Sequence, residues 1–296
     1  MRIVRDFETE TAFEVVAPEA VLCPFMFNSP HSGSRYPASF LAASRLDPQR
    51  IRRSEDAFVD ELFASALTHG APLMRANFPR AFLDVNREPY ELDPKMFAGR
   101  LPSYANIRSL RVAGGLGTIA RIVAEHEEIY AGPLDVDEAL QRIERIYKPY
   151  HATLRRWLAR QHVTFGYAVL IDCHSMPSLI RGMDNRNRPD FVLGDRYGTS
   201  CGASLVDGAV EILRSLGYAV ARNKPYAGGF ITEHYGRPGK GLHALQVEIN
   251  RGLYMNEETY ERTDQFERLV RDLGLFVAEI TALGGSGLRA EPLAAE

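Results

Sequence analysis

The sequence predicts an α/β fold, a three-layer sandwich in which helices cover a central mixed β-sheet. Short apolar runs bounded by turn residues alternate along the chain with longer amphipathic patterns of helical period, and elements in this order pack as an α/β sandwich. The chain has 296 residues, of which 45% are hydrophobic, so it is long enough to bury a large core. We expect a single domain over residues 1–283, followed by a loose tail at 284–296 that is rich in Gly and Ala and lacks periodicity.

The individual elements follow from these two patterns, taken in chain order. Strands are expected at 22–27, 72–77, 80–86, 166–172, 190–194, 217–221 and 243–250. Helices are expected at 54–69, 117–130, 135–161, 202–216 and 257–283.

Two of these helices carry clear boundary or kink signals. Ser54 is a good N-cap for the helix at 54–69, Glu55 and Asp56 occupy its first turn, where the helix dipole favours carboxylates, and Gly70 ends it. Pro149 predicts a kink in the helix at 135–161, because proline cannot donate the backbone hydrogen bond.

Composition excludes several classes of protein. A net charge of −3 gives no sign of a nucleic-acid partner. Three scattered cysteines are too few for a disulfide framework or a Cys-rich zinc site. The polar first residues do not form a signal peptide, and no apolar run approaches the ~18 residues needed to span a membrane. We expect a cytoplasmic protein without a membrane partner, and the sequence does not predict its oligomeric state.

Polar side chains of catalytic type follow four of the expected strands. They are His31; Asp84, Asn86 and Arg87; Asp172 and His174; and Glu248, Asn250 and Arg251. Because ligands bind at the carboxyl ends of strands in open α/β sheets, four such strand ends together predict a functional site.

Glu248 and two histidines suggest the chemistry of that site. In the stretch VEI, Val247 and Ile249 face one side of the sheet and Glu248 faces the other, where a buried carboxylate needs a cation, a bound water or a proton-transfer role. His31, His174 and a carboxylate could form a zinc site with an open fourth position, although the chain has no local H-E-x-x-H motif.

Two sequence features could instead indicate catalysis by a serine or a cysteine nucleophile. GTSCG at 198–202 matches G-x-S-x-G, but three residues separate it from the preceding apolar run, so Ser200 fits better as the N-cap of helix 202–216. Cys173 stands next to His174, but adjacent strand residues point to opposite faces and should not pair.

A set of short blocks resembles the N-formylglutamate amidohydrolase (formylglutamate deformylase) family. In order, these blocks are FNSPHSGSRYP, SEDAFVDELF, DVNREP, LIDCHSMPS, RPDFVLGD, GGFITEHYG and VEINRGLYM, and they cover roughly residues 20–256. The family is related to the zinc carboxypeptidases and the aspartoacylase-type deacylases. The resemblance therefore implies a zinc-carboxypeptidase-like (phosphorylase/hydrolase-like) fold and one zinc ion.

The resemblance also implies roles for individual residues. His31 and His174 would be zinc ligands, with Asp56 as the third ligand in preference to Glu55. The carboxypeptidase relatives place a Glu three residues after the first His, and this chain departs from that spacing. Glu248 falls where the relatives keep their catalytic Glu.

The implied reaction is hydrolysis of N-formyl-L-glutamate to formate and L-glutamate, as in histidine degradation. The substrate would be a small dianionic N-acyl amino acid, for which Arg87, Arg181 and Arg251 are candidate carboxylate binders and His151 is a further binding or oxyanion-stabilising candidate. The alternatives are a deacylase with another acyl or amino-acid specificity and a non-catalytic metal- or carboxylate-binding relative.

Overall fold

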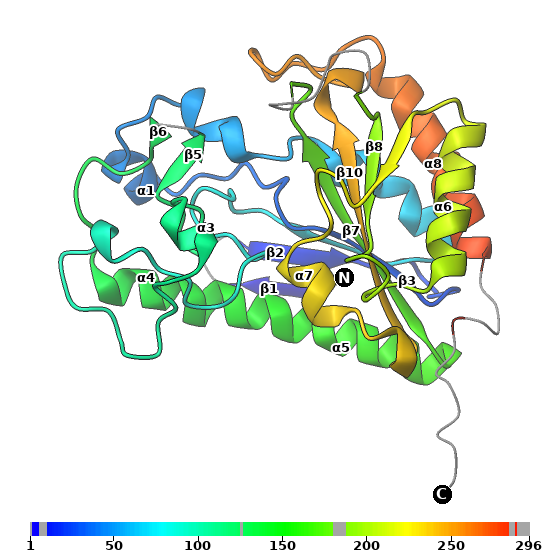
Figure 1. The fold of residues 1–296 in the computed structure, drawn as a ribbon, viewed down its shortest axis with the longest axis horizontal. Coiled ribbons are helices and arrows are strands. Elements are labelled where there is room, and N and C mark those ends of the chain that lie inside the picture. The colour runs from blue at the N-terminus through cyan, green and yellow to red at the C-terminus, as the bar shows by residue number, and fades with distance from the viewer. Residues whose placement is uncertain (1, 6–10, 125–126, 180–187, 284–287, 289–296) are drawn as a thin grey trace, which may run out of the picture.

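An eight-stranded mixed sheet forms the centre of the protein, as expected from the sequence (Figure 1). The computed structural model describes residues 2–5, 11–124, 127–179, 188–283 and 288. The strands of the sheet are β1 Arg2–Arg5, β2 Thr11–Val16, β3 Phe25–Ser29, β4 Leu73–Ala76, β7 Ala168–Met176, β8 Phe191–Gly194, β9 Val220–Arg222 and β10 Leu242–Asn250. Their spatial order is β1-β2-β4-β3-β7-β10-β8-β9. The central strands β4, β3, β7 and β10 run parallel, whereas β2 and β8 run antiparallel to their inner neighbours.

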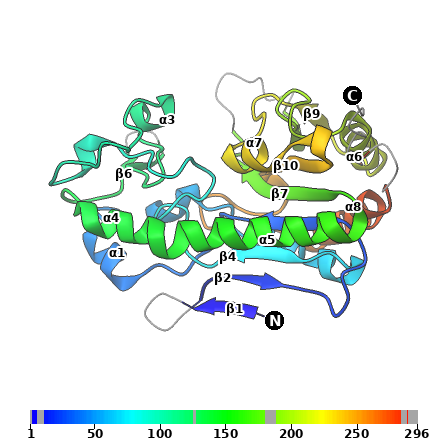
Figure 2. The same cartoon turned by 90° about the horizontal axis from the view of Figure 1, so that it is seen from below.

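Helices cover both faces of this sheet. The α-helices in the described part of the chain are α1 Ala38–Ala43, α2 Val59–Leu62, α3 Leu110–Ala113, α4 Val136–Arg142, α5 Lys148–Phe165, α6 Ala203–Ser215, α7 Phe230–Tyr235 and α8 Phe266–Ala282. One apolar core joins the sheet to α2, α6 and α8, and a second joins its other face to α4, α5 and α7. Figure 2 shows α5 running along one side of the sheet, and Figure 1 shows α6 and α8 together at the right of the molecule. The arrangement is the predicted three-layer α/β sandwich.

The central strands are buried along almost their whole length, because helices pack on both faces of the sheet. In β3, Phe25 and Phe27 enter the core under α6 and α8, whereas Met26 enters the core under α5. In β7, Ile171 enters the core under α6 and α8, and Leu170 enters the core under α5. The alternation of side chains along each strand therefore decides which core each residue enters. Because the central strands are parallel, the polar residues at their carboxyl ends lie at one edge of the sheet.

The expected strand at 80–86 is wrong. This segment has irregular backbone, although its apolar residues Phe82, Leu83 and Val85 are buried as a strand's would be. The backbone N–H of Asp84 donates to the carbonyl of Thr118 in a loop, at 2.8 Å, rather than to a strand of the sheet.

The expected helix at 117–130 is also wrong. In its place the structure has an antiparallel hairpin of β5 Ile122–Ala124 and β6 Glu127–Glu128. A Cβ at Gly117 would lie 2.2 Å from the carbonyl oxygen of Glu91, so this segment is held by close backbone approach to another loop rather than by helical bonds.

The expected helix at 54–69 is broken into three short pieces. They are a 3₁₀ helix at Arg50–Ser54, α2, and a 3₁₀ helix at Ala64–His69. Glu55 is extended and Phe58 has a left-handed φ of 66°, so Ser54 ends a helix instead of capping one. Gly70, at φ 75°, ends the last piece as predicted.

Two further helices differ from expectation at their boundaries. Where a kink was predicted near Pro149, a π-helical turn at Ile143–Tyr147 joins α4 to α5. The expected helix at 257–283 begins only at Phe266, as α8. Apart from Leu288, the expected tail at 284–296 lies outside the described residues. Within the described ranges, no helix has the length and apolar character needed to cross a membrane.

Candidate metal centre and active-site cavity

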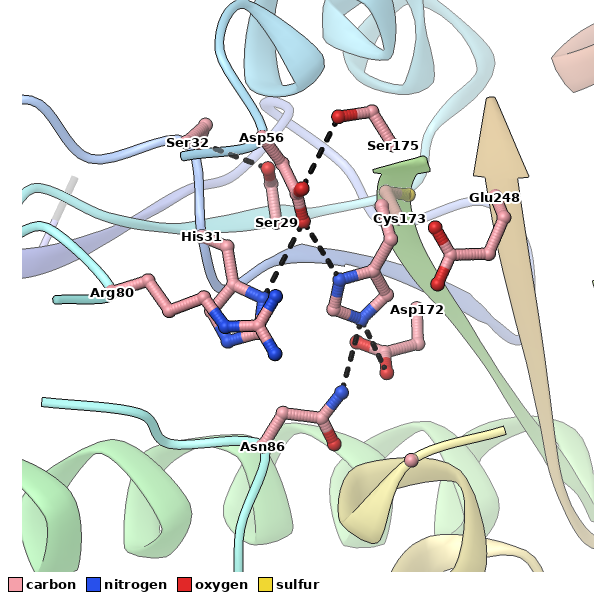
Figure 3. A network of polar contacts seen from close by, with 12 residues as sticks. Ser29, His31, Ser32, Asp56, Arg80, Asn86, Asp172, Cys173, Ser175 and Glu248 are labelled. Carbon is pink, nitrogen blue, oxygen red and sulfur yellow. Dashed lines mark hydrogen bonds and ion pairs between the residues drawn. The ribbon is translucent and has the colours of Figure 1, made fainter. Parts of the chain in front are cut away.

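Three segments bring His31, Asp56 and His174 together at the carboxyl ends of the central strands (Figure 3). His31 follows β3 on a turn that packs tightly, because a Cβ at Gly33 would lie 2.2 Å from the carbonyl oxygen of Phe78. The backbone N–H of Asp56 donates to the carbonyl of His31 at 2.9 Å, which fixes the second segment against the first. His174 lies near the end of β7, the strand beside β3.

One ligand-type atom from each of the three residues lies within 4.8 Å of the others, and all three side chains are buried. Asp56 Oδ2 is 3.0 Å from His174 Nδ1 and 3.4 Å from His31 Nδ1. Glu55, the other carboxylate considered, turns away and accepts hydrogen bonds from Tyr36 and Arg52. Of the two neighbouring carboxylates, the structure places Asp56 with the histidines.

Each imidazole is held by a second carboxylate on its far nitrogen. His31 Nε2 lies 2.9 Å from Asp84 Oδ1, and His174 Nε2 lies 3.0 Å from Asp172 Oδ2. In a neutral ring whose Nε2 donates to a carboxylate, the Nδ1 lone pair faces Asp56, which is the usual way a protein orients metal-binding histidines. The sequence placed Asp84 and Asp172 at strand ends but gave no signal of this role, because the pairing is spatial.

The residues present fit a divalent metal ion. Nδ1 of His31 is fully buried, yet it has no hydrogen-bond partner within the described residues. An unpartnered buried nitrogen is costly, and a cation bound between the two imidazoles and Asp56 would satisfy it. Two nitrogens and one carboxylate oxygen form a donor set that suits such an ion and leaves a coordination position open.

The charges around the centre shift its pKa values in opposite directions. Burial raises the pKa of Asp56, but the hydrogen bond from His174 and the charges of His174 and His31 outweigh burial and hold that pKa well below its usual range. Burial lowers the pKa of His174, but the charge of Asp172 and hydrogen bonds to Asp172 and Asp56 outweigh it and raise the pKa well above its usual value. Burial also opposes ionisation of Asp84, yet Arg80 and Arg87 hold its pKa low.

Glu248 stands on the strand next to His174. Residues 248 and 174 are direct partners across β10 and β7, and Figure 3 shows the Glu248 carboxylate pointing toward the His174 ring. Burial raises the pKa of Glu248 to about 7, although the His174 charge acts in the opposite direction. The carboxylate accepts a hydrogen bond from the side chain of Gln246 at 2.8 Å.

A cavity of about 480 Å³ opens over these residues and has a cationic lining. It is lined by the three ligand candidates, by Glu248 and by five arginines, which are Arg53, Arg80, Arg87, Arg196 and Arg251. Its lining carboxylates are Asp56, Asp84 and Glu248. Five guanidinium groups against three carboxylates favour an anionic ligand.

The two predicted arginines in the described part of the chain both line the cavity, but much of their hydrogen-bonding capacity is used. Arg87 donates to the carbonyls of Leu116 and Asn86. Arg251 donates to Asp56, at 3.0 Å, and to Ser175 and a backbone carbonyl. Arg181 lies outside the described residues.

Arg80 also lines the cavity, although it was not predicted from the sequence. Its Nε donates to Asp84 at 2.9 Å, and its two terminal nitrogens bind no described residue. The i,i+4 spacing of Arg80 and Asp84 is visible in the sequence. The segment was assigned to a strand, however, and residues four apart in a strand lie about 13 Å from each other, too far to form an ion pair.

His151 is not placed in the cavity, contrary to its expected role. Its Nε2 bonds to the carbonyl of Val85 and its Nδ1 to the hydroxyl of Tyr235, both at 2.9 Å. Burial lowers the pKa of His151 to about 4, so this buried ring of α5 is neutral and has a hydrogen-bond partner on each nitrogen.

Neither alternative nucleophile belongs to the site. Ser200 is buried and donates to the carbonyl of Ala244, and the N-cap of α6 is Gly202, so the predicted cap role of Ser200 is also wrong. Cys173 enters the core opposite to His174, and burial raises the pKa of its thiol.

Comparison with known proteins gives a consistent result. A family model described as N-formylglutamate amidohydrolase matches residues 23–255. N-formylglutamate deformylase of Pseudomonas putida is 31% identical over 237 residues, which is 79% of this chain and 82% of that relative. The crystal structure of N-formylglutamate amidohydrolase from Ralstonia eutropha JMP134 superposes with a TM-score of 0.85 at 37% identity, covering 92% of this chain and 97% of that one. A gene product of Agrobacterium tumefaciens, at 17% identity and a TM-score of 0.66, shares the fold.

Proposed function

Because this chain belongs to the N-formylglutamate amidohydrolase family, we propose that it hydrolyses N-formyl-L-glutamate to formate and L-glutamate. The observation that carries the proposal is the meeting of His31, Asp56, His174 and Glu248 in one arginine-lined cavity. A substrate with two carboxylates and one linear amide matches both the charge of this cavity and its catalytic groups.

We assign a zinc ion to His31, Asp56 and His174. The set of two imidazoles, one carboxylate and an open position is typical of catalytic zinc in hydrolases. When bound, zinc supplies Lewis-acid activation of water and of the formyl carbonyl. Asp84 and Asp172 keep the two imidazoles in the tautomer that leaves Nδ1 unprotonated.

Glu248 acts as the proton carrier. Its carboxylate accepts a proton from the water whose oxygen adds to the formyl carbon, and it returns that proton to the nitrogen as the C–N bond breaks. A pKa of about 7 suits both halves of this exchange, because the group can take and release a proton near neutral pH. Its place beside His174 sets the carboxylate at the edge of the metal centre.

The arginines bind the substrate carboxylates and the developing oxyanion. Arg80 is the best placed, since both terminal nitrogens are available while Asp84 fixes its Nε. Arg87 and Arg251 add positive charge at the cavity wall, and their existing bonds hold them rigid. Arg181 remains a sequence-based candidate for the same task.

Formate release tests the function directly. The purified protein is assayed with N-formyl-L-glutamate, N-acetyl-L-glutamate and N-formyl-L-leucine, after metal removal by chelation and after zinc is restored. We expect zinc-dependent hydrolysis with the formyl dianion as the preferred substrate. Faster hydrolysis of the acetyl compound would indicate a deacylase of another specificity, and no hydrolysis of any compound by zinc-loaded protein would refute the enzymatic proposal.

A further inference from the structure

Gln246 connects Glu248 to the turn at Gly228 and Gly229, which also lines the cavity and leads into α7. The two residues are separated by one position on β10, so they face the same side of the sheet. The Gln246 side chain is buried, at 4% exposed, and it lines the cavity. Its Nε2 donates to Glu248 Oε1 at 2.8 Å, and its Oε1 accepts from the backbone N–H of Gly229 at 2.7 Å.

The turn at the other end of this bridge is fixed on several sides. A Cβ on Gly229 would lie 2.4 Å from the side chain of Asn86, and one on Gly194 would lie 2.7 Å from the backbone of Ala227. Gly228 has a φ of 117°, which L side chains rarely adopt. Because the backbone of this turn packs directly against its neighbours, the N–H of Gly229 is a rigid anchor for the Gln246 amide.

Glu248 needs such an anchor because the cations around it compete for its carboxylate. His174, Arg80 and Arg251 all attract its negative charge. A carboxylate that turned to pair with one of them would be a poorer base and would leave the position from which it reaches the attacking water. The neutral Gln246 amide holds one carboxylate oxygen without adding a charge.

We propose that Gln246 is a positioning residue that fixes the Glu248 carboxylate between the metal centre and the Gly228–Gly229 turn. The hydrogen bond occupies Oε1 and leaves Oε2 as the oxygen that carries the proton. This inference rests on the proposed function, in which Glu248 is the base. Gln246 itself acts through Glu248.

Two substitutions distinguish the hydrogen bond from Gln246 to Glu248 from the hydrogen bond between Gln246 and Gly229. Gln246→Glu keeps the acceptor for Gly229 and replaces the donor to Glu248 by an oxygen, whereas Gln246→Met keeps the length and removes both contacts. For each variant, kcat and KM for N-formyl-L-glutamate, zinc content and thermal stability are measured. Gln265→Glu, at an exposed position before α8, controls for the added charge. We expect kcat to fall about 10- to 100-fold in both Gln246 variants, with KM and zinc content unchanged, because misplacement of a catalytic group has costs of this size.

A double-mutant comparison tells positioning from a general structural effect. Each Gln246 substitution is repeated in the Glu248→Gln background. If Gln246 acts through Glu248, it causes little further loss there, and the two effects are strongly non-additive. An equal loss in both backgrounds, loss of zinc, or unchanged kcat in the single variants would overturn the proposal. If Glu248→Gln alone leaves kcat unchanged, the base assignment fails first, and this inference fails with it.

Discussion

Two neighbouring buried carboxylates, Asp56 and Glu55, allow a matched test of the metal centre. Asp56→Asn and Glu55→Gln each replace a carboxylate by an amide of the same shape, and the two side chains are equally buried, at 1% exposed. Asp56 faces the two histidines, whereas Glu55 faces Tyr36 and Arg52. We expect the first substitution to abolish metal binding and the second to leave it intact.

The stabilisation that zinc gives each protein follows from its binding affinity. Replacing a residue that only orients a metal ligand weakens binding by about 10–100-fold, so loss of the charged ligand itself should cost about 100-fold or more. Zinc present at 100 times the Kd of the unsubstituted protein stabilises it by about 2.7 kcal/mol, whereas a variant that binds 100-fold more weakly gains about 0.4 kcal/mol. With an unfolding entropy of about 2.1 cal/mol/K per residue, these energies correspond to rises in Tm of about 4 °C and less than about 1 °C for 296 residues.

Differential scanning calorimetry of the metal-free proteins, with and without zinc, measures both shifts. Glu55→Gln should lower the Tm of the metal-free protein, because it weakens buried hydrogen bonds worth about 1–3 kcal/mol, but it should retain the full rise on adding zinc. If Glu55→Gln loses the zinc-dependent rise while Asp56→Asn keeps it, the assignment of the third ligand is inverted. If both variants keep the full zinc-dependent rise in Tm, the metal is not bound by either carboxylate and the proposed metal centre is refuted.

The remaining predictions concern catalysis, substrate binding and protons. Glu248→Gln should retain zinc and lose about 10²–10⁴-fold in kcat; loss of zinc would make Glu248 a ligand instead. The kcat/KM of the unsubstituted enzyme should fall about tenfold per pH unit below about 7, because Glu248 must be ionised to accept a proton and burial raises its pKa to about 7; a flat profile between pH 5 and 7 would argue against this base. Arg80→Lys should raise KM for N-formyl-L-glutamate about tenfold or more, and Arg87→Lys should raise it less, since two of the Arg87 nitrogens already bond to backbone carbonyls; the reverse order would exchange their roles. Zinc binding at pH 7 should release about one proton, measured by titration calorimetry in two buffers, because the raised pKa of His174 keeps its ring protonated without metal; no release would mean that the ring is already neutral.

The part of this site that the sequence predicts is the part built on regular strands. His174 and Glu248 lie on β7 and β10, where a two-residue period decides which face each side chain takes. His31 follows β3 on a turn rich in Pro, Ser and Gly, which is equally readable. These strands were predicted within a few residues of their observed ends.

The part that the sequence does not predict lies on irregular backbone. Asp56 was assigned to a helical first turn, but it stands in an extended segment whose geometry depends on its hydrogen bond to the His31 carbonyl. Asp84 and Arg80 were assigned to a strand because their apolar neighbours are spaced like one. In both segments tertiary contacts, and not local periodicity, determine the conformation, so the Asp84–His31 pair could not be inferred from spacing, and the strand assignment concealed the Arg80–Asp84 pair.

The three carboxylates that line the cavity have different partners, and this difference assigns their chemistry. Asp84 and Asp56 each accept a hydrogen bond from an arginine and contact an imidazole, and their pKa values lie well below the usual range. They stay ionised at all working pH values, as the proposed roles of orienting group and metal ligand require. Glu248 accepts its hydrogen bond from a neutral amide, and burial raises its pKa to about 7. Neighbouring acids whose environments separate their pKa values in this way divide into fixed charges and a proton carrier. Because its hydrogen-bond partner is neutral, Glu248 gains no ion pair from Gln246 that would offset the effect of burial, and its raised pKa suits the proposed role of proton carrier.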